Sequence, residues 1–331
     1  MREDIKVNYL RILRILSQAN GPLSSREITR RLSMRGYNMS ERTVRLYLAR
    51  MDKAGFTENF GKKGRIITEL GKKEVEENTI FEKVSLLSSK IDRLTYLMTF
   101  DVRTKTGTVV INISVMPHEI LVENLSYIEA VFEHGYGMGK LVTVFKPGET
   151  IGGITIPTNH VGIGTVCSVT LNGVLLHHGI PVTSLFGGLL ELRNHKPHRF
   201  AEVVYYQGTS IDPLEVFIRS RMTDYTGAIT SGSGRIGAGF REMPAESRNQ
   251  VIEIAQYLEE VGLGGFMIIG WPDEPVLDIP VPAGQIGSVV IGGLNPVAII
   301  EEKGNSISSR ALAALIDYGK LFPYYELRKH I

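Results

Sequence analysis

The stretch SERTVRLYLARMDKAGFTENFGKKGRIIT, residues 40–68, changes its hydrophobic period halfway along. Its first part predicts a helix capped by Ser40, because apolar residues recur at helical spacing from Val44 to Met51. Its second part alternates as strands do, around the turn Gly61-Lys62-Lys63-Gly64. A helix followed by a basic hairpin is typical of the second half of a winged helix-turn-helix.

Two earlier segments complete this arrangement. The apolar stripe from Ile5 to Leu16 predicts one helix, and Ser24 with Glu27 forms a capping-box pattern that opens a second. Three helices and a basic hairpin, in this order, predict a winged helix-turn-helix domain over residues 1–75. We expect its DNA-binding residues to be Ser40, Arg42, Thr43, Arg45, Lys62, Lys63 and Arg65, with the last three at the hairpin tip.

The charge is divided unevenly along the chain. Residues 1–75 hold 17 Lys and Arg against 8 Asp and Glu, a net charge of +9, although the whole chain carries only +2. The remainder therefore carries −7. A cationic domain beside an acidic body favours double-stranded DNA as the partner and argues against adhesion to membranes. A winged helix that binds another protein is the alternative.

Length and composition set the class of protein. The chain has 331 residues, of which 43% are hydrophobic and 22% charged, so two or three globular domains are expected. The single cysteine, Cys167, excludes an intramolecular disulfide and a cysteine-cluster metal site. Neither a signal-peptide core nor an apolar run of about 18 residues is found, and we expect a cytoplasmic protein.

Residues 76–97 predict a connecting helix. Its apolar positions recur every three to four residues: Phe81, Val84, Leu87, Ile91 and Leu94. Such a seam packs against the body of its own chain or against a partner chain, and both alternatives stay open.

Residues 98–331 contain an internal duplication, which shifts its offset from 127 to 123 residues partway along. The matched pairs include Met116-Pro117 with Met243-Pro244, Gly135 with Gly262, Ile163-Gly164 with Ile286-Gly287, and Leu171-Asn172 with Leu294-Asn295. The repeat predicts an α+β regulatory domain made of two duplicated lobes, about 98–193 and 222–321, joined by a crossing segment, 194–221. A cleft between related lobes is a natural place for a small ligand.

Hydrophobic patterns assign matching elements to the two halves. Strands are expected at Val109–Val115, Leu141–Phe145, Ile163–Thr170 and Val174–His177, and at Ile236–Arg241, Phe266–Ile269, Ile286–Ile291 and Val297–Ile300. Helices are expected at His118–His134 and Ala245–Val261, with short closing helices at Ser184–Leu192 and Ser309–Leu321. In and after the crossing segment we expect a strand at Ala201–Gln207, a short helix from Asp212-Pro213 to Arg219, and a loop over Tyr225–Gly234.

Two stretches carry a family resemblance. GIGTVCSVTLNGVLL, residues 162–176, and GTSIDPLEVFIRSRMT, residues 208–223, follow a winged helix here as they do in the NrpR-type nitrogen-regulatory repressors, which the chain resembles over nearly its whole length. The resemblance implies a homodimeric repressor of nitrogen-assimilation genes that releases DNA when 2-oxoglutarate binds the regulatory body. A dimer places its two recognition helices in successive major grooves, so a palindromic operator is expected. Many members carry two regulatory units after the winged helix, and this chain is long enough for one.

A dicarboxylate effector needs hydroxyl, amide and cationic donors. Thr165, Cys167 and Ser168 are expected on one strand, with Asn172 at its turn. The candidate ligand-binding residues are His160, Thr165, Cys167, Ser168, Asn172, Arg219 and Arg221. Cys167 also fits the role of a small core residue.

Other chemistry has weaker support. The glycines between Gly232 and Gly239 resemble a dinucleotide fingerprint, but the repeat predicts a strand where that fingerprint needs a helix. The pairs His177-His178 and His195-x-x-His198 lack the spacing and neighbours of a metal site. No nucleophile, base and orienting group recur together. We therefore expect no metal, no bound cofactor and no enzyme activity. The alternatives are an enzyme fused to a winged helix and a metal-responsive regulator of another ligand.

Overall fold

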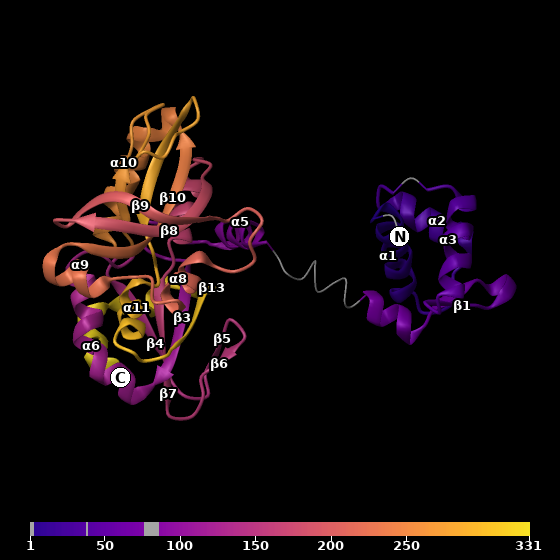
Figure 1. Cartoon of the computed structure of the whole chain (residues 1–331), viewed down its shortest axis with the longest axis horizontal. Coiled ribbons are helices and arrows are strands. Elements are labelled where there is room, and N and C mark those ends of the chain that lie inside the picture. The colour runs from indigo at the N-terminus through magenta and orange to yellow at the C-terminus, as the bar shows by residue number, and fades with distance from the viewer. Residues whose placement is uncertain (1–2, 38, 76–85) are drawn as a thin grey trace. The chain divides into compact units, whose positions relative to one another are not determined.

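The computed structural model describes residues 3–37, 39–75 and 86–331. It divides into two compact units, Met1–Ser85 and Leu86–Ile331 (Figure 1). Each unit has its own hydrophobic core.

The N-terminal unit is a winged helix, as the sequence predicts. Its elements are α1 (Glu3–Ser17), α2 (Ser25–Met34), α3 (Glu41–Lys53), β1 (Thr57–Asn59), the 3-10 turn η1 (Gly61–Lys63) and β2 (Arg65–Ile67). Ser24 and Ser40 cap α2 and α3 with their hydroxyls, as their positions in the sequence predict. The apolar stripes of the three helices meet in one core around Ile12, Leu32 and Leu48.

The hairpin of β1, η1 and β2 is the wing of this domain, and it approaches the start of α2 very closely. Leu23 and Arg65 exchange two backbone hydrogen bonds of 2.9 Å, so Leu23 acts as a third strand beside the hairpin. Gly64, which precedes Arg65, has a φ of +109°, and a Cβ there would lie 2.3 Å from the Leu23 carbonyl carbon. Only glycine satisfies both the conformation and the space.

The regulatory unit begins with α5 (Leu87–Leu97). Its buried face, Leu87, Ile91 and Leu94, belongs to the core of this unit. This part of the predicted connecting helix therefore packs on its own regulatory body. Phe81 and Val84 lie outside the described residues, and a role of the helix in dimerisation stays a prediction.

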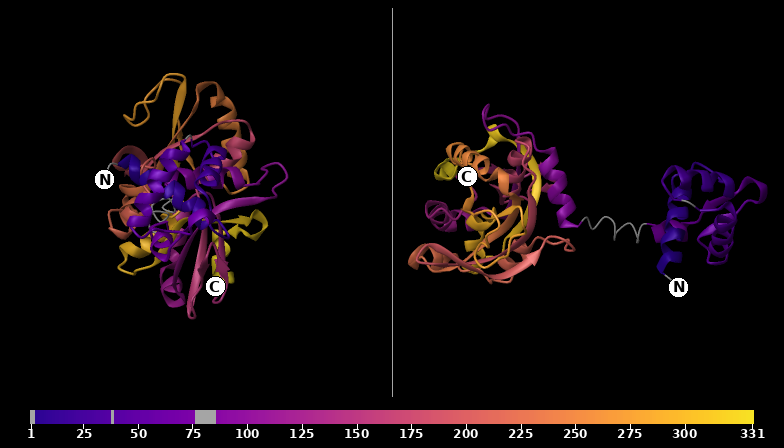
Figure 2. Two further views of the ribbon diagram at one scale, coloured as in Figure 1. Left: turned by 90° about the vertical axis from the view of Figure 1, so that its right-hand side faces the viewer. Right: turned by 90° about the horizontal axis from the view of Figure 1, so that it is seen from above.

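Two antiparallel five-stranded sheets form the regulatory unit, seen from three sides in Figures 1 and 2. One has the order β13 (Ser308–Asp317), β3 (Thr108–Pro117), β7 (His160–Val166), β4 (Leu141–Phe145) and β14 (Phe322–Pro323). The other has the order β11 (Phe266–Ile269), β12 (Gln285–Ile291), β10 (Gly234–Pro244), β8 (Thr183–Arg193) and β9 (Lys196–Tyr205). A small ribbon pairs β5 (Thr150–Ile151) with β6 (Ile154–Thr155).

The helices of this unit complete a duplicated fold. They are α6 (His118–Glu133), α7 (Val169–His177), α8 (Pro213–Arg219), α9 (Tyr225–Ser231), α10 (Arg248–Glu260), α11 (Asn295–Glu302) and α12 (Leu327–His330), with short 3-10 turns η2 (Ala245–Ser247), η3 (Tyr318–Lys320) and η4 (Tyr324–Glu326). The first half runs β3-α6-β4-β7-α7-β8 and the second β10-α10-β11-β12-α11-β13. This order confirms the predicted α+β fold with an internal repeat.

The two halves exchange their last strands. β8, from the first half, pairs with β10, and β13, from the second half, pairs with β3. Each sheet therefore contains a strand of the other half, and the sheets do not coincide with the stretches 98–193 and 222–321.

Several predicted elements were wrong at this exchange. Ser184–Leu192 and most of Ser309–Leu321, expected as helices, form β8 and β13. Val174–His177 and Val297–Ile300, expected as strands, lie in α7 and α11, and α9 occupies most of the loop expected at Tyr225–Gly234. α7 is buried from Val169 to Leu175 and α11 from Asn295 to Glu301, so these sequences lack the period that separates a helix from a strand.

The wing offers a test of this packing. We expect Gly64→Ala to destabilise the winged helix by about 2 kcal/mol or more, because it combines backbone strain with a clash against Leu23. Gly61→Ala is the matched control, since Gly61 also has a positive φ of +62° but has open space around it. Hydrogen exchange of α1 to α3 in the full chain measures the difference. Equal protection in the two variants would contradict the close packing.

Candidate functional site

The exposed side of α3 carries the cations expected to bind DNA. Arg42 and Arg45 are both exposed, and the Arg42 guanidinium makes no ion pair with another described residue. Arg45 pairs with Glu41 and donates from Nε to the Ser25 hydroxyl at 3.1 Å. The Ser25 hydroxyl and Arg45 lower the pKa of Glu41. Arg45 therefore joins α2 to α3 while its head stays in solvent.

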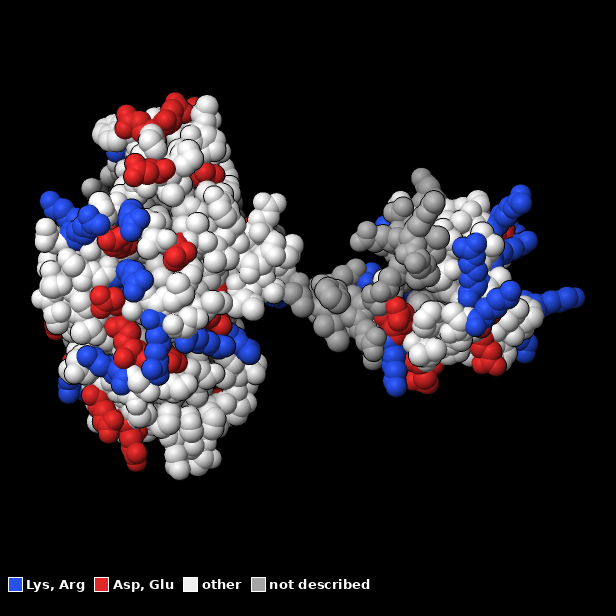
Figure 3. All heavy atoms as spheres, in the orientation of Figure 1, with Lys and Arg blue, Asp and Glu red and all other residues white. Residues whose placement is uncertain are grey.

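The wing supplies a second cationic group. Lys62 and Lys63 are exposed in η1, at the wing tip, and Figure 3 shows Lys and Arg side chains projecting from this unit. Arg65 lies near them, as expected, because it begins β2 at the turn end of the hairpin opposite Asn59, but its side chain is turned inward and is only 18% exposed. Its Nε donates to Asp52 at 2.8 Å, and the Thr57 hydroxyl donates to the other oxygen of that carboxylate at 2.6 Å. Arg65 fastens the wing to α3.

The hydroxyl and amide groups expected on one strand of the regulatory unit lie on three different elements. Thr165 is in β7, Cys167 and Ser168 form the link after it, and Asn172 is inside α7 rather than at a turn. The expected strand Ile163–Thr170 was therefore too long. The Thr165 hydroxyl is buried and has no hydrogen-bond partner among the described residues.

Arg241 was missed by the sequence reasoning, and it organises this region. It is 1% exposed, on β10. Its Nε donates to Asn172 Oδ1 at 3.2 Å, its Nη2 to the Ser168 hydroxyl at 3.2 Å, and its Nη1 to the Phe240 carbonyl at 3.1 Å. All these acceptors are neutral, and no described carboxylate lies within ion-pair distance of it. A buried, unpaired cation is costly and favours an anionic ligand.

A small cavity lies beside Arg241. Its lining includes Ser168, Asn112, Tyr206 and Ile91, the last from α5, and its volume of about 20 Å³ gives room for about one water molecule. A groove of about 530 Å³ shares Asp212 and Ala311 with this cavity and adds Leu87, Lys90, Arg219 and Arg310 to its lining. Because the two hollows share these lining residues, we call the cavity the chamber and the groove its entrance; the entrance carries both charges, since Asp212 and Glu215 line it together with the three cations.

The remaining candidates are scattered. Arg219 lines the entrance groove and donates from Nη2 to the Ser309 carbonyl at 3.3 Å. His160 lines a different hollow of about 800 Å³, with His118 and Lys146. Arg221 is exposed in the turn after α8 and lines neither the chamber nor the groove. The structure therefore brings together Cys167, Ser168, Asn172 and, at the entrance, Arg219, but neither His160 nor Arg221.

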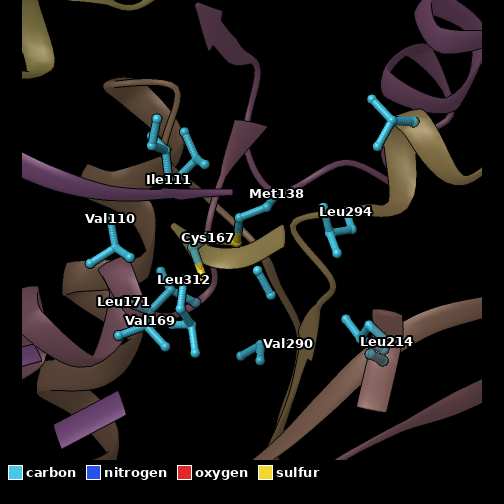
Figure 4. Close-up of a cluster of buried hydrophobic side chains, with 14 of the residues drawn as sticks. Val110, Ile111, Met138, Cys167, Val169, Leu171, Leu214, Val290, Leu294 and Leu312 are labelled. Atoms are coloured by element: carbon cyan, nitrogen blue, oxygen red, sulfur yellow. The ribbon is translucent and has the colours of Figure 1, made fainter. Parts of the chain in front are cut away.

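Cys167 lies among apolar side chains. Figure 4 shows it in a cluster with Val169, Leu171 and Leu312. Burial raises the pKa of its thiol to about 11. The thiol therefore stays protonated at neutral pH, which fits the interpretation of a small core residue.

Asp212 stands between the chamber and the entrance. Its carboxylate caps α8 by accepting the backbone N–H of Leu214 at 2.9 Å. Burial, reinforced by the nearby carboxylate of Glu215, raises the pKa of Asp212 to about 6. An Asp with this pKa changes charge close to neutral pH, beside the path to Arg241.

The glycine and histidine motifs have structural roles. The segment from Gly234 to Gly239 lies in β10 and is followed by β-strand rather than by a helix. His177 and His178 end α7, not a strand as expected. His195 forms a hydrogen bond with the Tyr136 hydroxyl at 3.0 Å in the β8–β9 hairpin. Within the described ranges, no group of three or more His, Cys, Asp or Glu is placed to hold a metal ion.

Comparisons with known families match both units. A family model described as NrpR regulatory domains NRD1 and 2 matches residues 84–322. A model described as the ribonuclease R winged-helix domain matches residues 10–75. None of the described helices is long and apolar enough to cross a membrane.

Individual proteins show the same likeness. The global nitrogen regulator NrpRI of Methanosarcina mazei is 34% identical over 96% of this chain and 98% of its own length. The global nitrogen regulator NrpR of Methanococcus maripaludis is 32% identical over 94% of this chain, which spans only 54% of that protein. A crystal structure of a nitrogen repressor-like protein from Methanococcus jannaschii superposes with a TM-score of 0.62 and 25% identity, over 72% of this chain and 99% of that one.

The raised pKa of Asp212 predicts a pH dependence. The folded carboxyl holds its proton up to about pH 6 and the unfolded one only to its ordinary value of 3.8, so the folded state binds more protons in between. Its contribution to stability is complete below about pH 4 and is lost, by up to about 3 kcal/mol, as the pH rises through 6.

We expect Asp212→Asn, which keeps the cap and carries no charge, to remove this dependence and to be the more stable protein at pH 7.5. Urea unfolding followed by circular dichroism at several pH values measures it. Asp224→Asn, at the cap of α9, is the control. Parallel pH profiles for Asp212→Asn and the wild type would contradict the assignment.

Proposed function

Because the chain belongs to the NrpR family of nitrogen regulators, we propose that it is a homodimeric repressor of nitrogen-assimilation genes that 2-oxoglutarate releases from a palindromic operator. The family consists of transcription regulators, not enzymes. The observation that carries the proposal is Arg241, a buried cation with neutral partners only, beside a chamber that α5 helps to close.

Arg241 suits a dicarboxylate. A guanidinium binds a carboxylate through two parallel hydrogen bonds, and such charged pairs are about twice as strong as neutral ones. The Ser168 hydroxyl, now held by Arg241, supplies a further donor. Lys90 at the entrance suits the second carboxylate, as does Arg219 in place of its present ion pair with Glu215 at 3.8 Å. The acceptors that Arg241 now uses are weaker than the ligand, so the ligand replaces them.

The chamber also supports a coupling mechanism. It holds about 20 Å³, far less than a five-carbon dicarboxylate, so its walls must part when the ligand enters. One wall is Ile91 of α5, and Leu87 of the same helix lines the entrance. In the chain, α5 follows the segment that leads from the winged helix. Displacement of α5 is the proposed route to the DNA-binding unit, and a coupling of about 1–3 kcal/mol suffices for a switch.

DNA recognition is assigned to α3 and the wing. In a dimer, two copies of α3 enter major grooves about 34–36 Å apart, or a multiple of that spacing, on a palindrome. In this arrangement the bases and phosphates of the DNA are faced by Arg42 and Arg45, together with Ser40 and Thr43 at the helix start. The phosphate backbone of the DNA is contacted by Lys62 and Lys63. Arg65 positions the wing rather than touching DNA.

Substitutions in α3 test whether this helix recognises the operator. We expect Arg42→Ala to lower the affinity for operator DNA by about tenfold or more, since about 1–3 kcal/mol is lost with a base contact. Lys62→Ala with Lys63→Ala should reduce the salt dependence of binding on any sequence. Arg65→Ala should destabilise the wing. Gel shifts with the DNA upstream of the gene for this protein, at several salt concentrations, measure the affinities. Arg193→Ala, in the regulatory unit, is the control. If the Arg42→Ala variant bound operator DNA with wild-type affinity, α3 would be excluded as the recognition helix.

Substitutions in the chamber test the effector. We expect Arg241→Lys and Ser168→Ala each to weaken 2-oxoglutarate binding by about tenfold or more, while ligand-free DNA affinity stays unchanged. Ser114→Ala is the control, because Ser114 has a buried hydroxyl that bonds to Ser309 at 2.8 Å in the other sheet. Calorimetry and gel shifts with the same samples measure both properties. Heat of binding without release of DNA would reject the coupling, and no heat from the wild type would reject the effector.

A further inference from the structure

The two halves of the regulatory unit differ at the edges of their sheets. In the first half, the C-terminal segment covers the edge strand β4: β14 pairs with β4, and the Tyr324 backbone N–H donates to the Lys140 carbonyl at 2.9 Å. Tyr324 also stacks on Phe132 of α6, with ring centroids 4.7 Å apart. The groove between α6 and β4 is therefore filled by the chain itself.

The matching groove in the second half is open. It lies between α10 and β11, has a volume of about 350 Å³, and is lined by Ile252, Ala255, Gln256, Glu259 and the strand Phe266–Ile269. β11 is the edge of its sheet, and no described strand pairs with its outer side. Its four residues are all apolar and half-buried. An edge strand without charge or proline presents unpaired backbone groups to another strand.

The side of α10 that borders this groove is self-complementary. Arg248, Ile252, Ala255 and Glu259 are spaced by four, three and four residues, which puts them in one stripe along the helix. The stripe has a cation at one end, a carboxylate at the other and two apolar side chains between them. Neither Arg248 nor Glu259 forms an ion pair with a described residue.

Local contacts hold the cationic end in place. Arg248 donates from Nε to the Gly270 carbonyl, just past the end of β11, at 2.7 Å. Its guanidinium lies over the ring of Trp271, 3.7 Å from the centroid, and Trp271 is 60% exposed. The guanidinium therefore lies at one end of the open edge with an aromatic side chain beside it, as at the centre of many protein interfaces.

We propose that this groove is the homodimer interface, in which β11 of two copies pair antiparallel and join their sheets into one. About the two-fold axis, the α10 stripes then run antiparallel. Arg248 faces Glu259 of the partner subunit, and Ile252 faces Ala255 of the partner subunit. Both pairs form together because Arg248 and Ile252 are four residues apart, as are Ala255 and Glu259. A second copy is favoured over an unrelated strand by this match of charge and residue spacing. This inference adds an interface to the proposed function, and it rests on that function only in expecting a dimer.

The charges can be exchanged to test the pairing. In the full chain, Glu259→Arg and Arg248→Glu should each raise the dimer dissociation constant by about tenfold or more, since each places like charges together. The double variant should restore it to near the wild-type value. Glu260→Arg, the same charge change one residue away and off the stripe, should leave it unchanged. Sedimentation velocity over a range of concentrations measures all four.

The strand pairing has its own readout. Amides of β11 should be protected from hydrogen exchange in the dimer and should exchange faster in Glu259→Arg under the same conditions. Ile268→Lys, which puts a charge on the edge strand, should also dissociate the dimer without unfolding the regulatory unit, as judged by circular dichroism.

Three results would overturn the interface: a monomeric wild type, single variants that dimerise as the wild type does, or a dimer whose β11 amides exchange freely. A monomer that gains β11 protection from a peptide with the sequence of residues 321–327 would assign the groove to another chain instead. Gel shifts on the same samples separate the two claims. Operator binding and release by 2-oxoglutarate with β11 exposed would leave the proposed function intact, whereas a β11 dimer without DNA affinity would reject the function alone.

Discussion

The backbone hydrogen bonds between β8 and β10, and between β13 and β3, determine the rest of the regulatory unit. Each half supplies the strand that completes the other half's sheet, so neither half has a complete sheet on its own. The exchange places Ser184 opposite Arg241 and Ser309 opposite Ser114. It also brings α7, from the first half, against Arg241 of the second. The chamber is therefore built by the exchange rather than by either lobe.

The sequence predicted local structure far better than long-range pairing. The winged helix was predictable because its caps, Ser24 and Ser40, and its helical stripes are local signals that the structure keeps. β4 and β11 were also predicted with their observed bounds. The failures cluster in α7, α11, β8 and β13, which are apolar on every side or buried by pairing with a distant strand. Hydrophobic period carries no information about such segments.

The candidate site was found in part, for a related reason. Ser168 and Asn172 were selected as polar residues in an apolar stretch, although the assumed strand was wrong. Arg241 was overlooked because its importance depends on α7 of the first half, which the exchange of strands brings against it. The repeat itself held a signal: at the offset of 127 residues Arg241 matches Ser114, so the second half has a charged side chain where the first half has a small hydroxyl. His160 and Arg221 were chosen for their charge alone, and charge does not predict position.

Duplication followed by divergence explains why the second half holds both proposed sites. The first half covers its sheet edge with β14 and fills the position of Arg241 with a paired serine. The second keeps an open edge at β11 and an unpaired cation on β10, two strands apart in the same sheet. A sheet transmits small shifts between neighbouring strands because its backbone hydrogen bonds resist shear. In the proposed mechanism, a ligand that draws Arg241 away from Asn172 and Ser168 acts on the sheet that the proposed dimer shares as well as on α5, and either route changes the spacing of the two winged helices.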